Sequence, residues 1–470
     1  MFEFGRELRR FFGGGRGWLA GKDGLTGGEA PLLELLDLKL LKSEAKGADV
    51  AAGRISVRDK PRRLLEAAVV WRELARRTGD NEALDKASAT AGRAADAFAT
   101  ARRQQGWARA RLEQGACALA AIDLFGEDPG LSDAAERAAK EAQKAGGAAG
   151  LLAQAMMANV RARRALAAGG PTEARAAARG FNDSLAQLTA AGRRDGALKL
   201  AAAWTRMDRA ELLLAAAVRL KDEGLARAAV GDLTAAAEPL EVSYHPLTLA
   251  RLRVGRAAAQ AALCELADDM DGLALAARDL TAALDWLGRD QSPLDWAKGQ
   301  TTLAHTLSEL GAASGSEEVI AKAMTRYERA YLAIGQAPAL VARIEAALGR
   351  TRCLARQAEL TGDLKGLNAV VTALKRELAA APHGADPAAW AMVQVQLGLL
   401  YAARLTLTGR DRGERAAAAL AFQAALEVFA EEGLRRLSAV AAQGLERLTA
   451  AKVSLPPLGR DRPRSGGGAR

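Results

Sequence analysis

The residues that could carry out chemistry in this sequence are few and widely separated. No two histidines have the spacing of a helical zinc motif, and no serine stands in the glycine-flanked turn of a hydrolase. The isolated cysteines argue against a disulfide framework or a zinc site and are predicted to be small buried side chains. These residues are His245, His305, His383, Cys117, Cys264 and Cys353. The sequence therefore predicts no metal, no cofactor and no enzymatic activity.

Two short motifs suggest a ligand but lack a required part. Gly21 and Lys22 resemble the end of a phosphate-binding loop, but Asp23 replaces the Ser or Thr of that motif and no strand is expected before it. The acidic run 268–271 could hold a cation, but it lacks the twelve-residue spacing of a calcium loop. We expect this run to be a solvated turn between helices.

The charge of the chain allows one further class of partner. The formal net charge is +10, and pairs of arginines recur near expected helix ends. Cations there stabilise the helix dipole, which explains most of the pairs without a ligand. A basic array could also bind nucleic acid, but aromatic residues are only 4% of the chain and none interleave with the arginines to stack on bases. Association with nucleic acid is kept as the alternative function.

Composition predicts an all-α protein. Hydrophobic residues make up 50% of the 470 residues, alanine is abundant and β-branched residues are sparse. No uncharged apolar run is long enough to cross a membrane, and charged residues interrupt the N-terminus where a signal peptide would be apolar. We therefore expect a cytoplasmic, reducing compartment. The excess of arginine over lysine suggests a bacterium with a GC-rich genome.

One pattern recurs along the chain: a small residue, a large apolar residue four positions later, and a second small residue three positions after that. These offsets place all three on one face of a helix. Its large residues are Phe98, Phe181, Leu233, Leu280, Tyr327 and Phe422, with weaker matches at Ala139 and Leu374. The spacing is close to 47 residues, so the arithmetic predicts eight repeating units.

A second pattern lies about 30 residues before the first in several units and marks the other helix of a pair. Small residues occupy a fixed frame within it: Gly115, Gly255, Ala304, Gly349 and Gly398. Glycine inside a helix costs roughly 1 kcal/mol relative to alanine, so its recurrence predicts that another helix crosses closely there. Ser292 and Asp386 precede prolines at expected helix starts and are predicted N-caps.

Taken together, the two patterns resemble the tetratricopeptide repeat. Leu397, Gly398 and Tyr401 in one helix, followed by the small–large–small pattern around Phe422 in the next, look like that family's signature. The resemblance covers roughly residues 61–450 and implies an α-solenoid of about eight antiparallel helix pairs, curved into a superhelix whose concave face binds proteins. The unit here is longer than the family's usual 34 residues, so longer helices or loops are expected.

The first twelve residues form an amphipathic pattern. On a helical wheel, apolar residues gather on one side and arginines on the other, and glycines follow. Such a helix would bind an anionic membrane, a groove on a protein partner, or this chain itself. The candidate binding residues are Phe4, Leu8, Phe11, Phe12, Arg6, Arg9, Arg10 and Trp18.

The expected organisation follows from these segments. It comprises an amphipathic helix 1–12, a glycine-rich linker 13–30, a lead-in 31–60, repeats 61–432, a capping helix 433–451 and a basic tail 452–470. The function predicted is that of a non-enzymatic scaffold that binds protein partners through its concave face. The N-terminal helix could tether it to the cytoplasmic face of the inner membrane.

Overall fold

The chain folds as stacked helix pairs. The computed structural model describes residues 33–53, 59–126, 128–334, 340–380 and 386–450, and these residues form helices and turns without a strand. The chain divides into two compact units, Met1–Ala347 and Leu348–Arg470, and helix α17 contains the boundary between them. Each unit is described by itself below.

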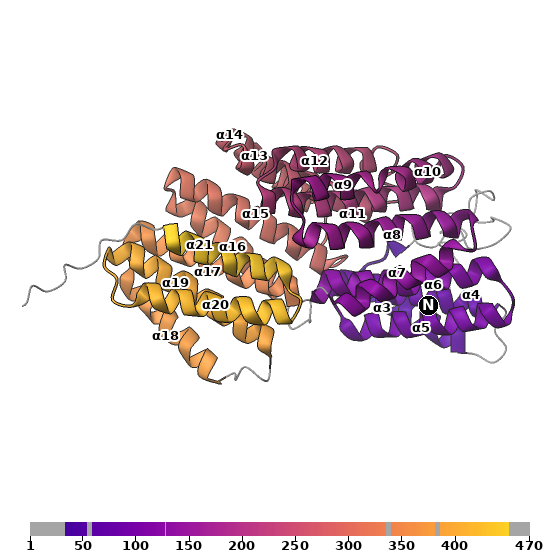
Figure 1. Cartoon of the computed structure of the whole chain (residues 1–470), viewed down its shortest axis with the longest axis horizontal. Helices are drawn as coiled ribbons and strands as arrows, with labels where there is room; N and C mark the ends of the chain where they lie inside the picture. The colour runs from indigo at the N-terminus through magenta and orange to yellow at the C-terminus, as the bar shows by residue number, and fades with distance from the viewer. Residues whose placement is uncertain (1–32, 54–58, 127, 335–339, 381–385, 451–470) are drawn as a thin grey trace, which may run out of the picture. The chain divides into compact units, whose positions relative to one another are not determined.

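Eight antiparallel helix pairs follow one another along the described residues, as Figure 1 shows. The first helices of the pairs are α4 (Lys60–Thr78), α6 (Gln104–Phe125), α8 (Gly147–Ala168), α11 (Gly196–Leu220), α13 (Pro246–Leu266), α15 (Pro293–Ser314), α17 (Leu340–Thr361) and α19 (Pro387–Thr408). The second helices are α5 (Asn81–Thr100), α7 (Pro129–Gln143), α9 (Pro171–Arg179) with α10 (Asn182–Gly192), α12 (Glu223–Ala237), α14 (Met270–Leu284), α16 (Glu317–Ile334), α18 (Leu364–Ala380) and α20 (Glu414–Glu431). The predictions of an all-α fold and of a solenoid like that of tetratricopeptide repeats are confirmed.

Helices α3 (Leu38–Gly53) and α21 (Arg435–Ala450) flank the pairs. Helix α3 packs against α4, and α21 packs against α20 and α19. Both helices bury an apolar side, represented by Leu41 in α3 and Ala441 in α21. They therefore add apolar contacts to the first and last pairs.

Local sequence explains where the helices stop and start. Gly79 adopts a left-handed φ of 73° at the end of α4, a conformation that costs glycine little. The next residue, Asp80, accepts a hydrogen bond from the backbone N–H of Ala83 and so caps α5. Asp386 caps α19 in the same way, as predicted.

Two local predictions need correction. Ser292 occupies the N-cap position of α15, as predicted, but its hydroxyl donates to Asp295 at 2.6 Å and accepts no hydrogen bond from the helix backbone. The second helix of the third pair is not continuous: it ends at Arg179 and restarts after Phe181. Gly180 has low helix propensity, and the Phe181 ring at the break is almost fully buried. Burial of this ring thus accompanies a break that the helical pattern had not indicated.

Two glycines of the predicted frame, Gly115 and Gly398, lie at close helix contacts, as expected, whereas Gly255 has only an ordinary contact with Leu233. A methyl group built on Gly115 in α6 would come within 2.6 Å of the Met156 sulfur in α8. One built on Gly398 in α19 would overlap the ring of Phe422 in α20 at 2.8 Å. Larger side chains at these positions would push neighbouring helices apart.

Candidate functional site

The first helices of unit 1 form a closed succession. Each packs against the next, in the order α4, α6, α8, α11, α13 and α15, and α15 returns to pack against α4. The two helices at the closure are far apart in sequence, since Arg76 and Asp295 are separated by 219 residues. Unit 1 therefore places its first helices next to one another around a ring.

Polar side chains join every neighbouring pair of helices in this ring. We call these contacts the rungs and the surface that they share the rung face. The rungs are Arg72–Glu113, Asp123–Arg163, Asn159–Asp208, Trp204–Thr248, Glu265–His305 with Arg251–Asp295, and finally Asp295–Arg76. Several of these side chains keep access to solvent, with Asp123 46% exposed and His305 43% exposed. The rung face is therefore polar and partly accessible.

The rungs between helices α6, α8 and α11 form one connected chain. Arg163 donates to Asp123 at 2.8 Å and to the side-chain carbonyl of Asn159 at 2.7 Å. The amide of Asn159 then donates to Asp208 at 2.9 Å. Glu211 lies one helical turn beyond Asp208 and is exposed. Three carboxylates thus gather around one guanidinium.

This crowding perturbs Asp208. Burial and then the negative charge of Glu211 raise the pKa of the Asp208 carboxyl to about 7, and Arg163 offsets only part of that rise. Protein atoms closely surround the side chain, yet part of it stays open to solvent. A cationic group arriving from a partner would be stabilised at this position.

Replacing Asp208 is expected to change the pH dependence of stability. Because the folded-state pKa of Asp208 is above its unfolded value near 4, the folded state binds more protons between these values, and its stability decreases as pH rises through them. Asp208→Asn removes that cost, so urea unfolding should show a more stable variant at a pH of about 8 and little difference at a pH of about 4. The exposed Asp85→Asn is the control. An equal difference at both pH values would contradict the assignment.

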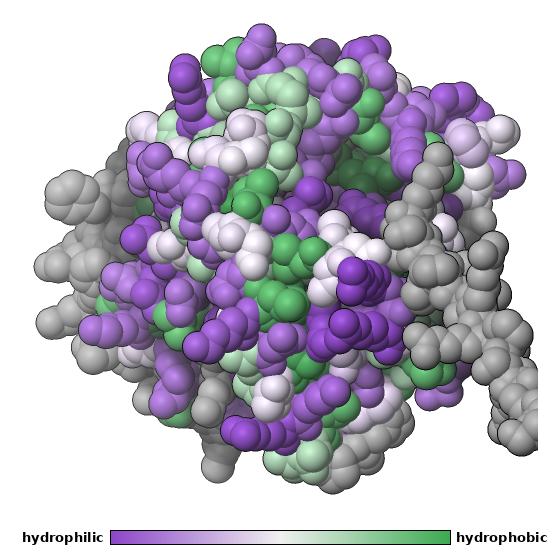
Figure 2. All heavy atoms as spheres, turned by 90° about the vertical axis from the view of Figure 1, so that its left-hand side faces the viewer, coloured by the Kyte–Doolittle hydropathy of each residue, from purple (hydrophilic) through white to green (hydrophobic). Residues whose placement is uncertain are grey.

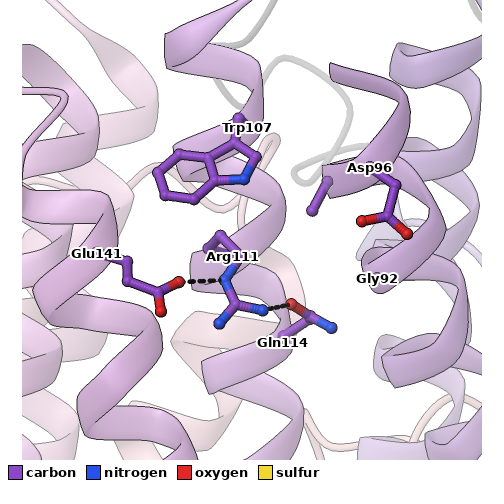
Figure 3. Close-up of a pocket in the computed structure, with 7 residues that line it drawn as sticks. Gly92, Asp96, Trp107, Arg111, Gln114 and Glu141 are labelled. Carbon is purple, nitrogen blue, oxygen red and sulfur yellow. Dashed lines mark hydrogen bonds and ion pairs between the residues drawn. The ribbon is translucent and has the colours of Figure 1, made fainter. Parts of the chain in front are cut away.

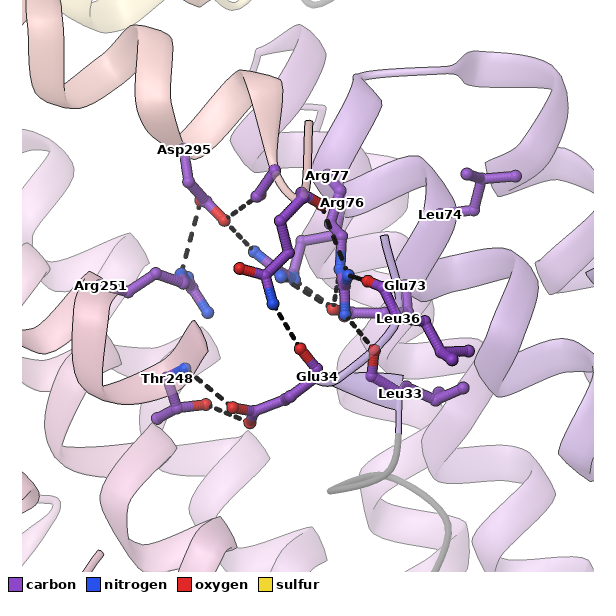
Figure 4. A network of polar contacts seen from close by, with 12 residues as sticks. Leu33, Glu34, Leu36, Glu73, Leu74, Arg76, Arg77, Thr248, Arg251 and Asp295 are labelled. Atoms are coloured by element: carbon purple, nitrogen blue, oxygen red, sulfur yellow. Dashed lines mark hydrogen bonds and ion pairs between the residues drawn. The ribbon is translucent and has the colours of Figure 1, made fainter. Parts of the chain in front are cut away.

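A buried polar network closes the ring between α4 and the starts of α13 and α15 (Figure 4). Arg77 is fully buried and donates to Glu73 at 2.7 Å, to the Leu33 carbonyl at 2.7 Å and to the Leu36 carbonyl at 2.8 Å. Glu34 accepts from the backbone N–H of Thr248 at 2.9 Å and from its hydroxyl. Residues 33–37 are thus bound on one side to α4 and on the other to α13, and we call them the strap.

Charges in this network stabilise one another. Burial alone would raise the pKa of Glu73, but Arg76 and Arg77 lower it to about 2. The Asp295 carboxylate forms ion pairs with Arg76 at 2.7 Å and with Arg251 at 3.4 Å. These two cations hold the pKa of Asp295 well below its usual range, although the side chain is buried. Burial raises the pKa of Glu34. The closure therefore depends on paired charges away from bulk water.

Sequence reasoning missed this closure. Arg76 and Arg77 form one of the arginine pairs that the sequence assigns to helix-dipole stabilisation, and both do lie in the last turn of α4. Both also pair with Glu73, and outside α4 they bind Asp295 of α15 and two carbonyls of the strap. The position of Glu34 immediately before a helix gave no signal of its contact with Thr248 of the fifth pair.

Other sequence candidates fall into ordinary structural positions. His245 ends the turn before α13, and Asp269 caps α14 by accepting from the Gly272 N–H. Cys117, Cys264 and Cys353 are buried, as predicted. The phosphate-loop candidate, together with Phe4, Leu8, Phe11, Phe12, Arg6, Arg9, Arg10 and Trp18, lies outside the described residues. Among the helices that are described, none has the length and apolar character needed to cross a membrane.

Comparison with known proteins adds little to this picture. No protein-family model matches the chain, and no curated protein matches its sequence. A solved structure of a Rap protein complexed with competence and sporulation factor is 13% identical, with 83% of this chain and 98% of that chain covered and a TM-score of 0.45. A circular tandem repeat protein with a novel repeat topology is 16% identical, with 83% and 96% covered and a TM-score of 0.27. These values are too low to support an inference about function.

Proposed function

We propose that the chain is a non-enzymatic scaffold that binds a protein partner along the rung face of unit 1. The observation that carries this proposal is that neighbouring first helices present a continuous series of polar, partly accessible side chains. A polypeptide has backbone donors and acceptors at regular intervals, so an extended segment could hydrogen-bond to several rungs at once.

The negative charges of Asp208 and Glu211 on the rung face favour a partner that places a basic residue beside them. Arg163 lowers the pKa of Asp208, but burial and the negative charge of Glu211 outweigh it. A lysine or arginine of the partner would relieve the repulsion between these carboxylates and would favour the ionised form of Asp208. On the face of the molecule that Figure 2 shows, hydrophobic surface appears in small groups among hydrophilic side chains.

Charge reversal on the rung face tests the proposal. Glu211→Lys should abolish co-purification of the native partner from the source cell, because it places a cation beside the expected basic group. Asp279→Lys makes the same charge change on an exposed position of α14, away from the rungs, and should leave co-purification unchanged. If both variants retain the partner equally, the rung face is not the binding surface.

The N-terminal residues suggest where the scaffold works. We propose that residues 1–12 form a separate amphipathic anchor, joined by the linker 13–30 to the lead-in 31–60, the repeats 61–432, the cap 433–451 and the tail 452–470. An anionic membrane at the cytoplasmic face fits their arginines and phenylalanines. Liposome flotation should then be lost on deletion of residues 1–12 while the helical unfolding transition is retained. Flotation that survives the deletion would assign membrane binding to another surface.

A further inference from the structure

A hollow of about 330 Å³ lies between α5, α6 and α7 in unit 1 (Figure 3). Its lining residues are Gly92, Ala95 and Asp96 of α5, Trp107, Arg111 and Gln114 of α6, and Glu141 of α7. Gly92 and Ala95 are small, and a methyl group on Gly92 would already approach the Gln114 amide to 3.0 Å. The small residues of α5 therefore keep this hollow open.

The hollow is separate from the rung face. Trp107, Arg111 and Gln114 follow one another at offsets of four and three, so they share one side of α6. The rung residues Glu113 and Asp123 project about 130° and about 150° away from the middle of that stripe at 100° per residue. Helix α6 thus presents one side to the rungs and the other to the hollow.

The polar groups of the hollow are unevenly satisfied. Arg111 donates to Glu141 at 2.7 Å and also to the Gln114 carbonyl, so its charge is already paired. Asp96 is exposed, and its carboxylate takes no part in any described hydrogen bond or ion pair. In Figure 3 its carboxylate lies across the hollow from the Trp107 indole. One carboxylate therefore remains unpaired opposite an aromatic ring.

We propose that this hollow binds an arginine side chain of a protein partner. A guanidinium is planar, so it can stack on the Trp107 ring while its N–H groups donate to the Asp96 carboxylate. With Asp96 and Glu141 negative and Arg111 positive, the lining carries a net charge of −1, which complements one cation. The volume lies at the lower end of ligand pockets and suits a single side chain.

Arginine is preferred over other occupants on these contacts. An acidic side chain would meet Arg111, but that guanidinium is engaged by Glu141 and Gln114. An apolar side chain would leave Asp96 desolvated without a partner, which costs free energy. The hollow does not depend on the rung face, so it can bind even if the proposed function there is wrong.

Titration of the full chain with blocked amino acids tests the assignment. The probes are Nα-acetyl-arginine amide and its neutral isostere Nα-acetyl-citrulline amide, and the readout is the indole N–H resonance of Trp107, assigned by its loss in Trp107→Phe. Arginine should shift this resonance and bind at least about tenfold more tightly than citrulline, because a charge-assisted pair with Asp96 is lost in citrulline.

Matched variants separate the carboxylate from general effects. Asp96→Asn should weaken arginine binding about tenfold and should remove the preference over citrulline, whereas Asp85→Asn on the same helix should change neither. Equal binding of the two probes, an unchanged affinity in Asp96→Asn, or no shift of the Trp107 resonance would each overturn the proposal.

Discussion

Replacing Arg77 by methionine should destabilise unit 1 by about 3–5 kcal/mol, the usual cost of removing one partner from a buried charge network. The side chain is fully buried and supplies donors to Glu73 and to carbonyls of the strap. Methionine fills similar space but donates no hydrogen bond. Urea unfolding of unit 1 should therefore shift to a lower midpoint.

In Arg77→Met, the backbone near the lost hydrogen bonds should open more often even where the unit as a whole stays folded. Hydrogen exchange should accelerate in the strap and in the turn 288–292, because the Leu38 N–H donates to the Asp290 carbonyl at that closure. Helices α19 and α20 in unit 2 should be unaffected. Arg62→Met in the same helix is the control, since Arg62 is 40% exposed and its pair with Glu66 is worth at most about 1 kcal/mol. Equal effects of the two substitutions would show that the buried network does not hold the closure.

Truncating Phe422 to alanine should cost unit 2 about 3–5 kcal/mol, because it leaves a cavity where a large ring was fully buried. The ring lies against two glycines, Gly398 of α19 and Gly444 of α21, whose hypothetical methyl groups would come within 2.8 Å and 2.6 Å of it. One side chain thus joins three helices. Thermal or urea unfolding should report the loss.

Two further variants test this explanation. Leu420→Ala removes a similar apolar group from the same helix at a position that is 67% exposed, and its effect should stay within about 0.5 kcal/mol. Gly444→Leu alone should destabilise the unit through overlap with the ring, but it should restore part of the stability when Phe422 is already alanine. Strictly additive effects would show that the ring and the glycine do not compete for one space.

Much of the fold was predictable from repeated spacing. Phe98, Leu280 and Phe422 are all buried in second helices, and their recurrence indicated the helix pairs and their number. Gly115 and Gly398 indicated where neighbours approach closely. These features depend on residues near one another in sequence, since helix periodicity and capping act within a few turns.

The candidate site was less predictable, because its residues follow no period. Asp208 appears in the sequence as an ordinary helical acid, and only the neighbouring helices bring Asn159 and Arg163 to it. Asp96 and Trp107 lie on different helices, and only the packing of α5 against α6 makes them face each other.

The sequence by itself determined the helices, their pairing and most of their ends. Only the tertiary structure decided that α15 returns to α4 and that the strap is held in the closure. The physical reason is the distance along the sequence over which each effect acts. Helix periodicity acts within a few turns, whereas the Arg76–Asp295 contact depends on the small rotations between successive helix pairs, added up over 219 residues. Long-range contacts of single charged residues leave no pattern in one sequence, so the closure could be recognised only in three dimensions.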